Sequence, residues 1–204
     1  MLAAPIPGSV RAATLADVEP IVSTLTTAFF NDPLWGPTFP DVERRAEQAS
    51  GFWRLLATSA LRYPWTLVTD KVESAAVWIP PGGVELTDAE QDNIEDFLID
   101  LTGRPVADLI MTLFEQFEAA RPSEPHYYLS LLATHNDHRG SGLGMALLQE
   151  NLARIDALGA AAYLESSNPA NDKRYSSVGF APRGEIVTPS GHVVTTMWRP
   201  QLGQ

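Results

Sequence analysis

Three glycines at alternate positions mark the stretch of this sequence that is best suited to binding an anion. Gly140, Gly142 and Gly144 stand between an apolar, strand-like run at 127–133 and a helix-like run at 143–158. Because glycine has no Cβ, it lets backbone N–H groups approach a bound group closely. A helix N-terminus adds unpaired N–H donors and the positive end of the helix dipole. The pattern therefore predicts a phosphorylated cofactor at this turn.

Two common phosphate-binding motifs do not fit the turn. The P-loop requires Lys and then Ser or Thr after its last glycine, where this chain has Met145 and Ala146. The dinucleotide fingerprint requires a third glycine at the position that Met145 occupies. What remains is Arg-x-x-Gly-x-Gly, formed by Arg139, Gly142 and Gly144. By itself this short motif is equally typical of a glycine-rich turn that binds nothing.

A second motif follows thirty-one positions after Gly144 and changes the interpretation. It reads Tyr-x-x-x-Gly-Phe from Tyr175 to Phe180, and Asn168 and Asn171 precede it. One expected helix and one expected strand lie between the two motifs. In order, spacing and intervening elements, residues 126–181 resemble the GNAT superfamily of acyl-CoA-dependent N-acyltransferases. Elsewhere the resemblance is loose, and the segments 31–37 and 121–128 look similar to puromycin-acetyltransferase-like members.

The resemblance implies an α/β (α+β) GNAT fold, in which helices flank both faces of a central mixed, mostly antiparallel twisted sheet. It also implies acetyl-CoA as co-substrate, with the pyrophosphate on the glycine-rich turn and the pantetheine arm along the central strand. Arg139 either contacts a phosphate or only caps the preceding loop, and Asn168 and Asn171 are alternative contacts to the arm. The expected cofactor-binding residues are Leu132, Ala133, Thr134, Arg139, Gly140, Ser141, Gly142, Leu143, Gly144, Met145, Asn168 and Asn171.

Acetyl transfer from a thioester to an amine poses three chemical problems. The amine must be neutral although its pKa is about 10, the carbonyl oxygen gains charge, and the departing thiolate benefits from a proton. By resemblance, backbone N–H groups at 132–134 serve the oxygen, Tyr175 protonates the thiolate, and Glu165 deprotonates the amine through water. The alternatives are a Tyr175 that only packs under the cofactor and a Glu165 that only orients the acceptor or pairs with a neighbour.

The acceptor is expected to contact the segment 31–37, where the family builds one wall of its acceptor cleft. Asp32 beside Trp35 suits a cationic or aromatic amine, although Trp35 is equally suited to covering the core. The hypothesis is an N-acetyltransferase that moves an acetyl group directly from acetyl-CoA to the primary amine of a small molecule, in a ternary complex. The alternatives are a protein or peptide N-acetyltransferase and a non-catalytic acyl-CoA sensor.

The elements that must position these residues are read from apolar spacing and turn signals. A capping box at 14–17 follows a short strand at 10–13 and opens a helix that ends near 31–33. A second helix is expected at 41–61, and a hairpin from strands at 65–69 and 74–79. Two helices within 88–118, divided at Gly103, form an expected insertion at about 81–118, which either covers the acceptor pocket or only adds packing. Further strands are expected at 161–165 and 193–198.

Composition bounds the remaining possibilities. The 204 residues are expected to form one domain, 1–204, acting as a monomer or homodimer. A formal charge of −11 argues against nucleic acid as a partner and weakly favours cationic substrates. Without cysteine, and with four histidines outside metal-ligand spacing, no metal is expected. No apolar run is long enough for a membrane span, and residues 1–7 lack a signal-peptide pattern, so a cytoplasmic location is expected.

Overall fold

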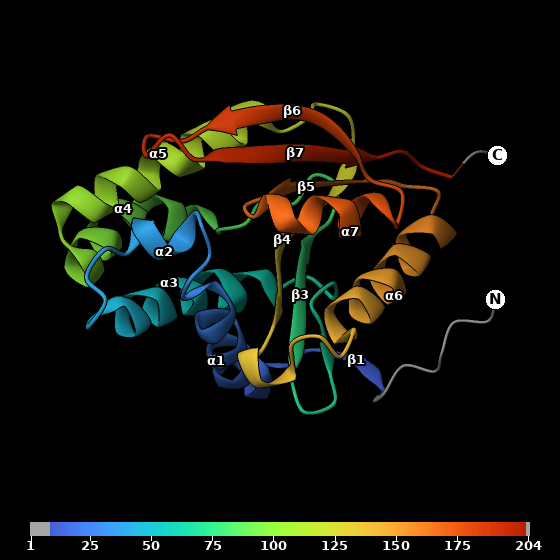
Figure 1. Cartoon of the computed structure of the whole chain (residues 1–204), viewed down its shortest axis with the longest axis horizontal. Helices are drawn as coiled ribbons and strands as arrows, with labels where there is room; N and C mark the ends of the chain where they lie inside the picture. Colours follow the sequence, from blue (N-terminus) through green and yellow to red (C-terminus); the bar gives the residue numbers. More distant parts are fainter. Residues whose placement is uncertain (1–8, 203–204) are drawn as a thin grey trace.

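The computed structural model describes residues 9–202, so the expected lack of a signal peptide at 1–7 falls outside the described part. Figure 1 shows helices packed on both sides of a central sheet. The elements, in chain order, are β1 (Val10–Ala12), η1 (Leu15–Asp17), α1 (Val18–Phe29), α2 (Trp35–Thr38), α3 (Arg45–Ala60), β2 (Leu67–Thr69), β3 (Ser74–Ile79), α4 (Asp88–Thr102), α5 (Arg104–Ala120), β4 (His126–Thr134), η2 (Asn136–His138), α6 (Leu143–Ala157), β5 (Ala161–Ser166), η3 (Pro169–Asn171), α7 (Asp172–Ser176), β6 (Ala181–Val187) and β7 (Val193–Arg199).

The seven strands form one mixed sheet in the order β1-β2-β3-β4-β5-β7-β6. Every neighbouring pair is antiparallel except β4 and β5, which are parallel and connected by α6. The expected mixed, mostly antiparallel sheet is therefore confirmed. Residues of β3 are buried on both faces, as expected for an inner strand covered by helices on each side.

Each face of the sheet carries its own hydrophobic core. On one face, α1, α3, α4 and α5 pack over β3 and β4 around the fully buried rings of Phe52 and Trp53. On the other face, α6 packs through Leu147, Leu148 and Ile155. In Figure 1, α6 lies to the right of β3 and β4, while α1 and α3 lie below and to the left. The sheet is thus enclosed between these two layers of helices.

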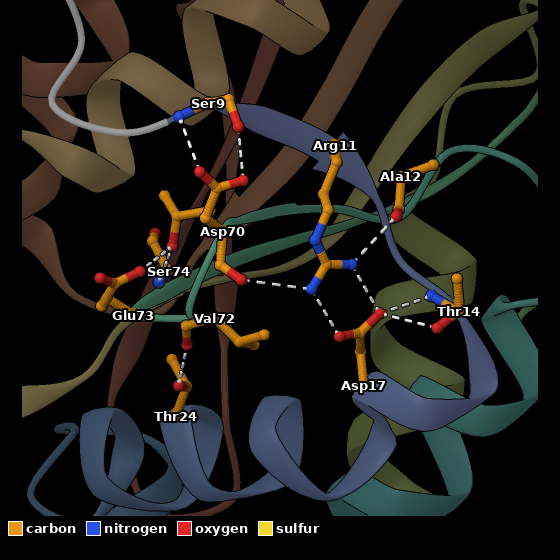
Figure 2. A network of polar contacts seen from close by, with 11 residues as sticks. Ser9, Arg11, Ala12, Thr14, Asp17, Thr24, Asp70, Val72, Glu73 and Ser74 are labelled. Atoms are coloured by element: carbon orange, nitrogen blue, oxygen red, sulfur yellow. Dashed lines mark hydrogen bonds and ion pairs between the residues drawn. The ribbon is translucent and has the colours of Figure 1, made fainter.

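Polar contacts around Asp17 connect β1 to the beginning of α1, as Figure 2 shows. Arg11 donates two hydrogen bonds of 2.7 Å to the carboxylate of Asp17, which also accepts from the N–H of Thr14 at 2.8 Å. This is the predicted capping box, and it precedes α1. Further along α1, the hydroxyl of Thr24 donates to the carbonyl of Val72 at 2.6 Å. These bonds fix α1 against the β2–β3 turn.

Several element boundaries differ from the sequence predictions. The helix expected from residue 41 begins at Arg45, because the Asp41 carboxylate accepts from the N–H groups of Glu43 and Arg44 and forms a turn there. The helices α2 and α7 and the edge strand β6 were not predicted. The two helices expected within 88–118 are present and are divided at Gly103, whose φ is 87°. Within residues 9–202, no helix is both long enough and apolar enough to cross a membrane.

Candidate active site

The site begins where two parallel strands separate. β4 and β5 pair only from His126 opposite Ala161 to Leu129 opposite Leu164, although β4 continues to Thr134. The pairing of β4 with β3 shifts register at the same level, so that Ser130 is an extra residue in β4. A bulge of this kind bends a strand and re-aims its neighbours. The edge of β4 at 130–134 that faces β5 is thus left without a strand partner.

The glycine-rich turn lies beside this free edge and presents unpaired donors. None of the N–H groups of residues 140–145 has an acceptor within the described part of the chain. Gly142 caps α6 with a φ of 81°, a conformation that residues with a Cβ rarely adopt. Gly144 allows a close approach of α6 to β4, because a Cβ there would lie 2.8 Å from the Thr134 hydroxyl. The turn is therefore built to receive an anion on its backbone.

A cleft of about 600 Å³ joins the turn to the separated strands. Eleven of the twelve expected cofactor-binding residues line it; the exception is Ser141, whose hydroxyl donates to the carbonyl of His138. Arg139 lines the cleft and donates one hydrogen bond to the carbonyl of Ala28 at 2.5 Å. Two basic side chains that were not predicted, His138 and Arg174, also line it. The cleft therefore combines backbone donors with positive side chains.

A smaller cavity, of about 70 Å³, adjoins the cleft. The two spaces share five residues, and these mark their junction: Phe29, Asp32, Leu132, Asn171 and Tyr175. The cavity is walled by aromatic side chains, including Phe114 and Phe117 of α5. Of the two helices expected within the insertion, α5 thus contributes to this wall. The carboxylates of Asp32, Glu85 and Glu165 line the cavity, while no Lys, Arg or His within the described part does so.

Asp32 and Trp35 form one side of the junction. The Asp32 carboxylate accepts from the N–H groups of Leu34 and Trp35 at 2.9 and 3.2 Å, and from the Ser167 hydroxyl at 3.0 Å. Asp32 therefore shapes the loop after α1 and fastens it to the end of β5. Trp35 lines the cavity and also packs edge-on against Trp53, with ring centroids 5.1 Å apart. Trp35 thus belongs to both the cavity wall and the core.

Tyr175 is the side chain at the junction that carries a transferable proton. Burial raises the pKa of its phenol to about 12, and the negative charges of Asp32 and Asp172 add to this. The phenol consequently keeps its proton at neutral pH. A neutral phenol in this position is able to donate a proton to a thiolate, but it is not able to act as a base.

Glu165 lies in a different group of charges within the same cavity. Burial raises the pKa of its carboxyl to about 7, while Arg121 and the hydroxyls of Tyr128 and Tyr163 lower it. Its Oε1 atom is buried and has no hydrogen-bond partner among residues 9–202. The charges that shift the pKa of Tyr175 do not include Glu165. The two residues predicted to be catalytic thus share a cavity but have separate electrostatic surroundings.

Comparison with known proteins identifies the family. Residues 63–180, which are more than half of the chain, match the model of the acetyltransferase (GNAT) family. The chain belongs to the GNAT family. It is therefore an acetyl-CoA-dependent N-acetyltransferase, and the matched segment contains both sequence motifs and the separated strands of the cleft.

Solved structures of similar fold agree with this assignment. An acetyltransferase from Corynebacterium glutamicum, described as histone acetyltransferase HPA2 and related acetyltransferase, is 27% identical, with a TM-score of 0.71 over 96% of this chain and 97% of that one. Arylalkylamine N-acetyltransferase 2 from Aedes aegypti is 13% identical, with a TM-score of 0.60 over 94% and 98%. The ribosomal-protein-S18-alanine N-acetyltransferase from Escherichia coli is 14% identical, with a TM-score of 0.51 over 96% of each chain. The last two share the fold alone.

Residues of both motifs line the cleft, but the motifs did not indicate the part of the cavity wall that the cleft does not share. Glu85, Phe114 and Phe117 line that wall and were not among the expected site residues. Glu85 follows the proline- and glycine-rich break at 80–83, a position without a helical or strand pattern. The apolar spacing of α5 indicated packing, and Phe117 serves both purposes, since it is buried in the core and lines the cavity.

Proposed function

We propose that this enzyme transfers the acetyl group of acetyl-CoA to the primary amine of a small molecule, directly and within a ternary complex. The observation that carries the proposal is the junction at Tyr175, where a cofactor-sized cleft meets a smaller cavity. A thioester in the cleft and an amine in the cavity would meet at this point. Direct transfer then needs no covalent enzyme intermediate.

The cleft fits the shape and charge of acetyl-CoA. The free N–H groups at 140–145 and the N-terminus of α6 suit its diphosphate, and Arg139 has donors left beyond its bond to Ala28. The free edge of β4 at 130–134 suits the amide-bearing pantetheine arm, which would pair as an added strand. The same edge offers N–H groups at 132–134 to the carbonyl oxygen as it gains charge.

The cavity fits a small amine with a cationic or aromatic character. Three carboxylates line it together with aromatic rings, a combination that attracts ammonium groups by charge and by cation–π contact. Phe114 and Phe117 of α5 line it together with Asp32 and Trp35, and its volume is about 70 Å³. These dimensions favour a compact acceptor over a peptide that extends across the surface.

The proposed reaction assigns a proton to each side of the transfer. The amine nitrogen attacks the thioester carbonyl carbon, and the carbon–sulfur bond breaks with its electron pair leaving on sulfur. The phenol of Tyr175 gives its proton to the sulfur and regains one from solvent. Glu165, with its pKa of about 7, takes the surplus proton of the amine through water.

Thiol release tests the proposal directly. The enzyme is incubated with acetyl-CoA and a panel of small primary amines or short peptides, and free CoA is measured with a thiol reagent. Release with small cationic or aromatic amines, and an acetylated product of the expected mass, would support the assignment. Release with peptides alone would indicate a protein N-acetyltransferase. Calorimetric binding of acetyl-CoA without release by any amine would indicate a sensor.

A further inference from the structure

Glu85, which lines the acceptor cavity but not the cofactor cleft, forms a mostly buried ion pair. Arg121, which follows α5, donates to the Glu85 carboxylate at 3.1 Å, and their side chains are 25% and 21% exposed. The other oxygen of Glu85 accepts from the hydroxyl of Ser130 at 2.6 Å. The Arg121 guanidinium also lies 4.0 Å above the ring centre of Tyr128. The pair thus connects the β3–α4 loop, the end of α5 and the bulge of β4.

Glu165, on β5, lines the same cavity as Glu85. The charged or titratable groups around it are Tyr163 on its own strand, Tyr128 on β4, Arg121 after α5 and Glu85 in the β3–α4 loop. Arg121 favours the charged form of Glu165, and Glu85 opposes that effect. The two tyrosine hydroxyls are themselves held neutral, because burial raises the pKa of each phenol. Arg121 and Glu85 therefore act on the pKa of Glu165 in opposite directions.

The opposed effects of the pair have a physical consequence. Arg121 without Glu85 would hold Glu165 as a carboxylate that is reluctant to take a proton. Without Arg121, burial would leave Glu165 protonated, and a protonated carboxyl is not able to accept the proton of the amine. With Glu85 neutralising part of the attraction, the carboxyl exchanges its proton near neutral pH. This is the range in which a general base is most effective.

We propose that Glu85 and Arg121 are positioning residues that together set the pH at which Glu165 accepts a proton from the acceptor amine. The geometry behind this is the ion pair, its fastening to Ser130 and Tyr128, and the cavity that Glu85 shares with Glu165, whose buried Oε1 has no hydrogen-bond partner among residues 9–202. The inference rests on the proton-accepting role of Glu165 in the proposed function. Neither residue needs to touch the substrate.

The first arm of the test measures Glu165 itself, without any acceptor. Protein labelled with ¹³C at the glutamate carboxyl is titrated by NMR, and E165Q assigns the resonance. We expect a midpoint near 7 in the wild type. The midpoint should fall by about one pH unit in E85Q and rise by about one in R121Q. A neighbouring charge commonly shifts the pKa of a buried carboxyl by about one unit or more. R121K keeps the charge and should stay close to the wild type.

The second arm measures the acid limb of kcat/KM with an accepted amine. Because the base must be deprotonated, the rate rises with pH through the Glu165 midpoint, so the limb should move to lower pH in E85Q and to higher pH in R121Q. E150Q is the matched control: it removes the partner of Arg154 from a surface pair on α6, 3.2 Å apart, and should move neither quantity.

Each outcome decides a separate claim. Unchanged NMR midpoints in E85Q and R121Q would overturn the inference. If R121Q does not fold, the two single variants E85Q and R121K are compared instead: a lower midpoint in E85Q but not in R121K supports the inference, and an unchanged midpoint in E85Q overturns it. Midpoints that move in opposite directions support it. A moved midpoint with an unmoved acid limb would support the pair's control of charge while refuting Glu165 as proton acceptor. Absence of acetylation with every amine would refute the proposed function, and the NMR arm would still decide the inference.

Discussion

The closest approach between the glycine-rich turn and the central strand gives a sharp prediction for Gly144→Ala. An alanine Cβ at this position would lie 2.8 Å from the Thr134 Oγ1, which is closer than real Cβ atoms approach a neighbour. Thr134 has little room to yield, because its hydroxyl already lies 3.1 Å from that of Ser74. The start of α6 must therefore move away from β4, and the N–H donors at 140–145 move with it.

Two opposed effects determine how much Gly144→Ala changes the free energy of unfolding. Alanine in place of glycine normally stabilises a helix by about 0.5–1 kcal/mol, whereas overpacking of a tight contact costs about 1–3 kcal/mol. We therefore expect Gly144→Ala to lower the free energy of unfolding by about 1 kcal/mol, measured by urea denaturation. Displaced donors should weaken acetyl-CoA binding about tenfold in calorimetry, which corresponds to about 1.4 kcal/mol.

A double mutant isolates the contact. In a Thr134→Ala background the threonine side chain no longer obstructs the new Cβ. There, Gly144→Ala should show only its helix-stabilising effect, so that it raises the free energy of unfolding instead of lowering it. Each comparison is made within its own background, which cancels the loss of the bond to Ser74. If Gly144→Ala is equally stabilising in both backgrounds, the contact does not limit the approach of α6, and the explanation for this glycine is wrong.

Three further predictions concern single side chains. Tyr175→Phe should lower kcat by about 10²-fold, measured as CoA release with a thiol reagent, and should leave the affinity for acetyl-CoA unchanged. An unaltered kcat would exclude the general-acid role of Tyr175. Glu165→Gln should abolish the acid limb of kcat/KM near pH 7, and a limb that persists there would assign the proton to another group. Asp17→Asn should lower stability at pH 7 by about 1–3 kcal/mol, because Arg11 holds the pKa of this carboxyl below its usual range. That stabilisation is fully present above the unfolded pKa of about 3.9 and is lost as pH falls through the lower folded value, so melting temperatures that differ equally at pH 7 and pH 2 would contradict it.

The residues predicted to bind the cofactor line one cleft because most of them are close together in the sequence. The turn at 139–145 follows β4 and begins α6, so one local pattern specified the donors, the bend and the helix. Tyr175 was predictable from a fixed spacing after that turn, although the five-residue α7 that carries it is too short to show periodicity. Local sequence therefore sufficed where the chain itself brings the functional groups together.

The acceptor cavity was less predictable because its walls come from distant segments. Glu85 lines the cavity and accepts hydrogen bonds from Ser130 and Arg121, and each of these comes from a different element. The edge strand β6 was missed because Pro182 and Gly184 interrupt its pattern, and its register against β7 shifts between them. An edge strand tolerates both residues, since its outer side needs no ladder hydrogen bonds. Such features follow from tertiary pairing, which no local pattern reveals.

The central claim is that cofactor and acceptor meet at Tyr175, and a structure of the dead-end ternary complex with CoA and an accepted amine tests it most directly. The account predicts the CoA sulfur within hydrogen-bond reach of the Tyr175 hydroxyl, and the amine inside the cavity between Asp32 and Glu165. An amine bound outside that cavity, or a sulfur directed away from Tyr175, would contradict it.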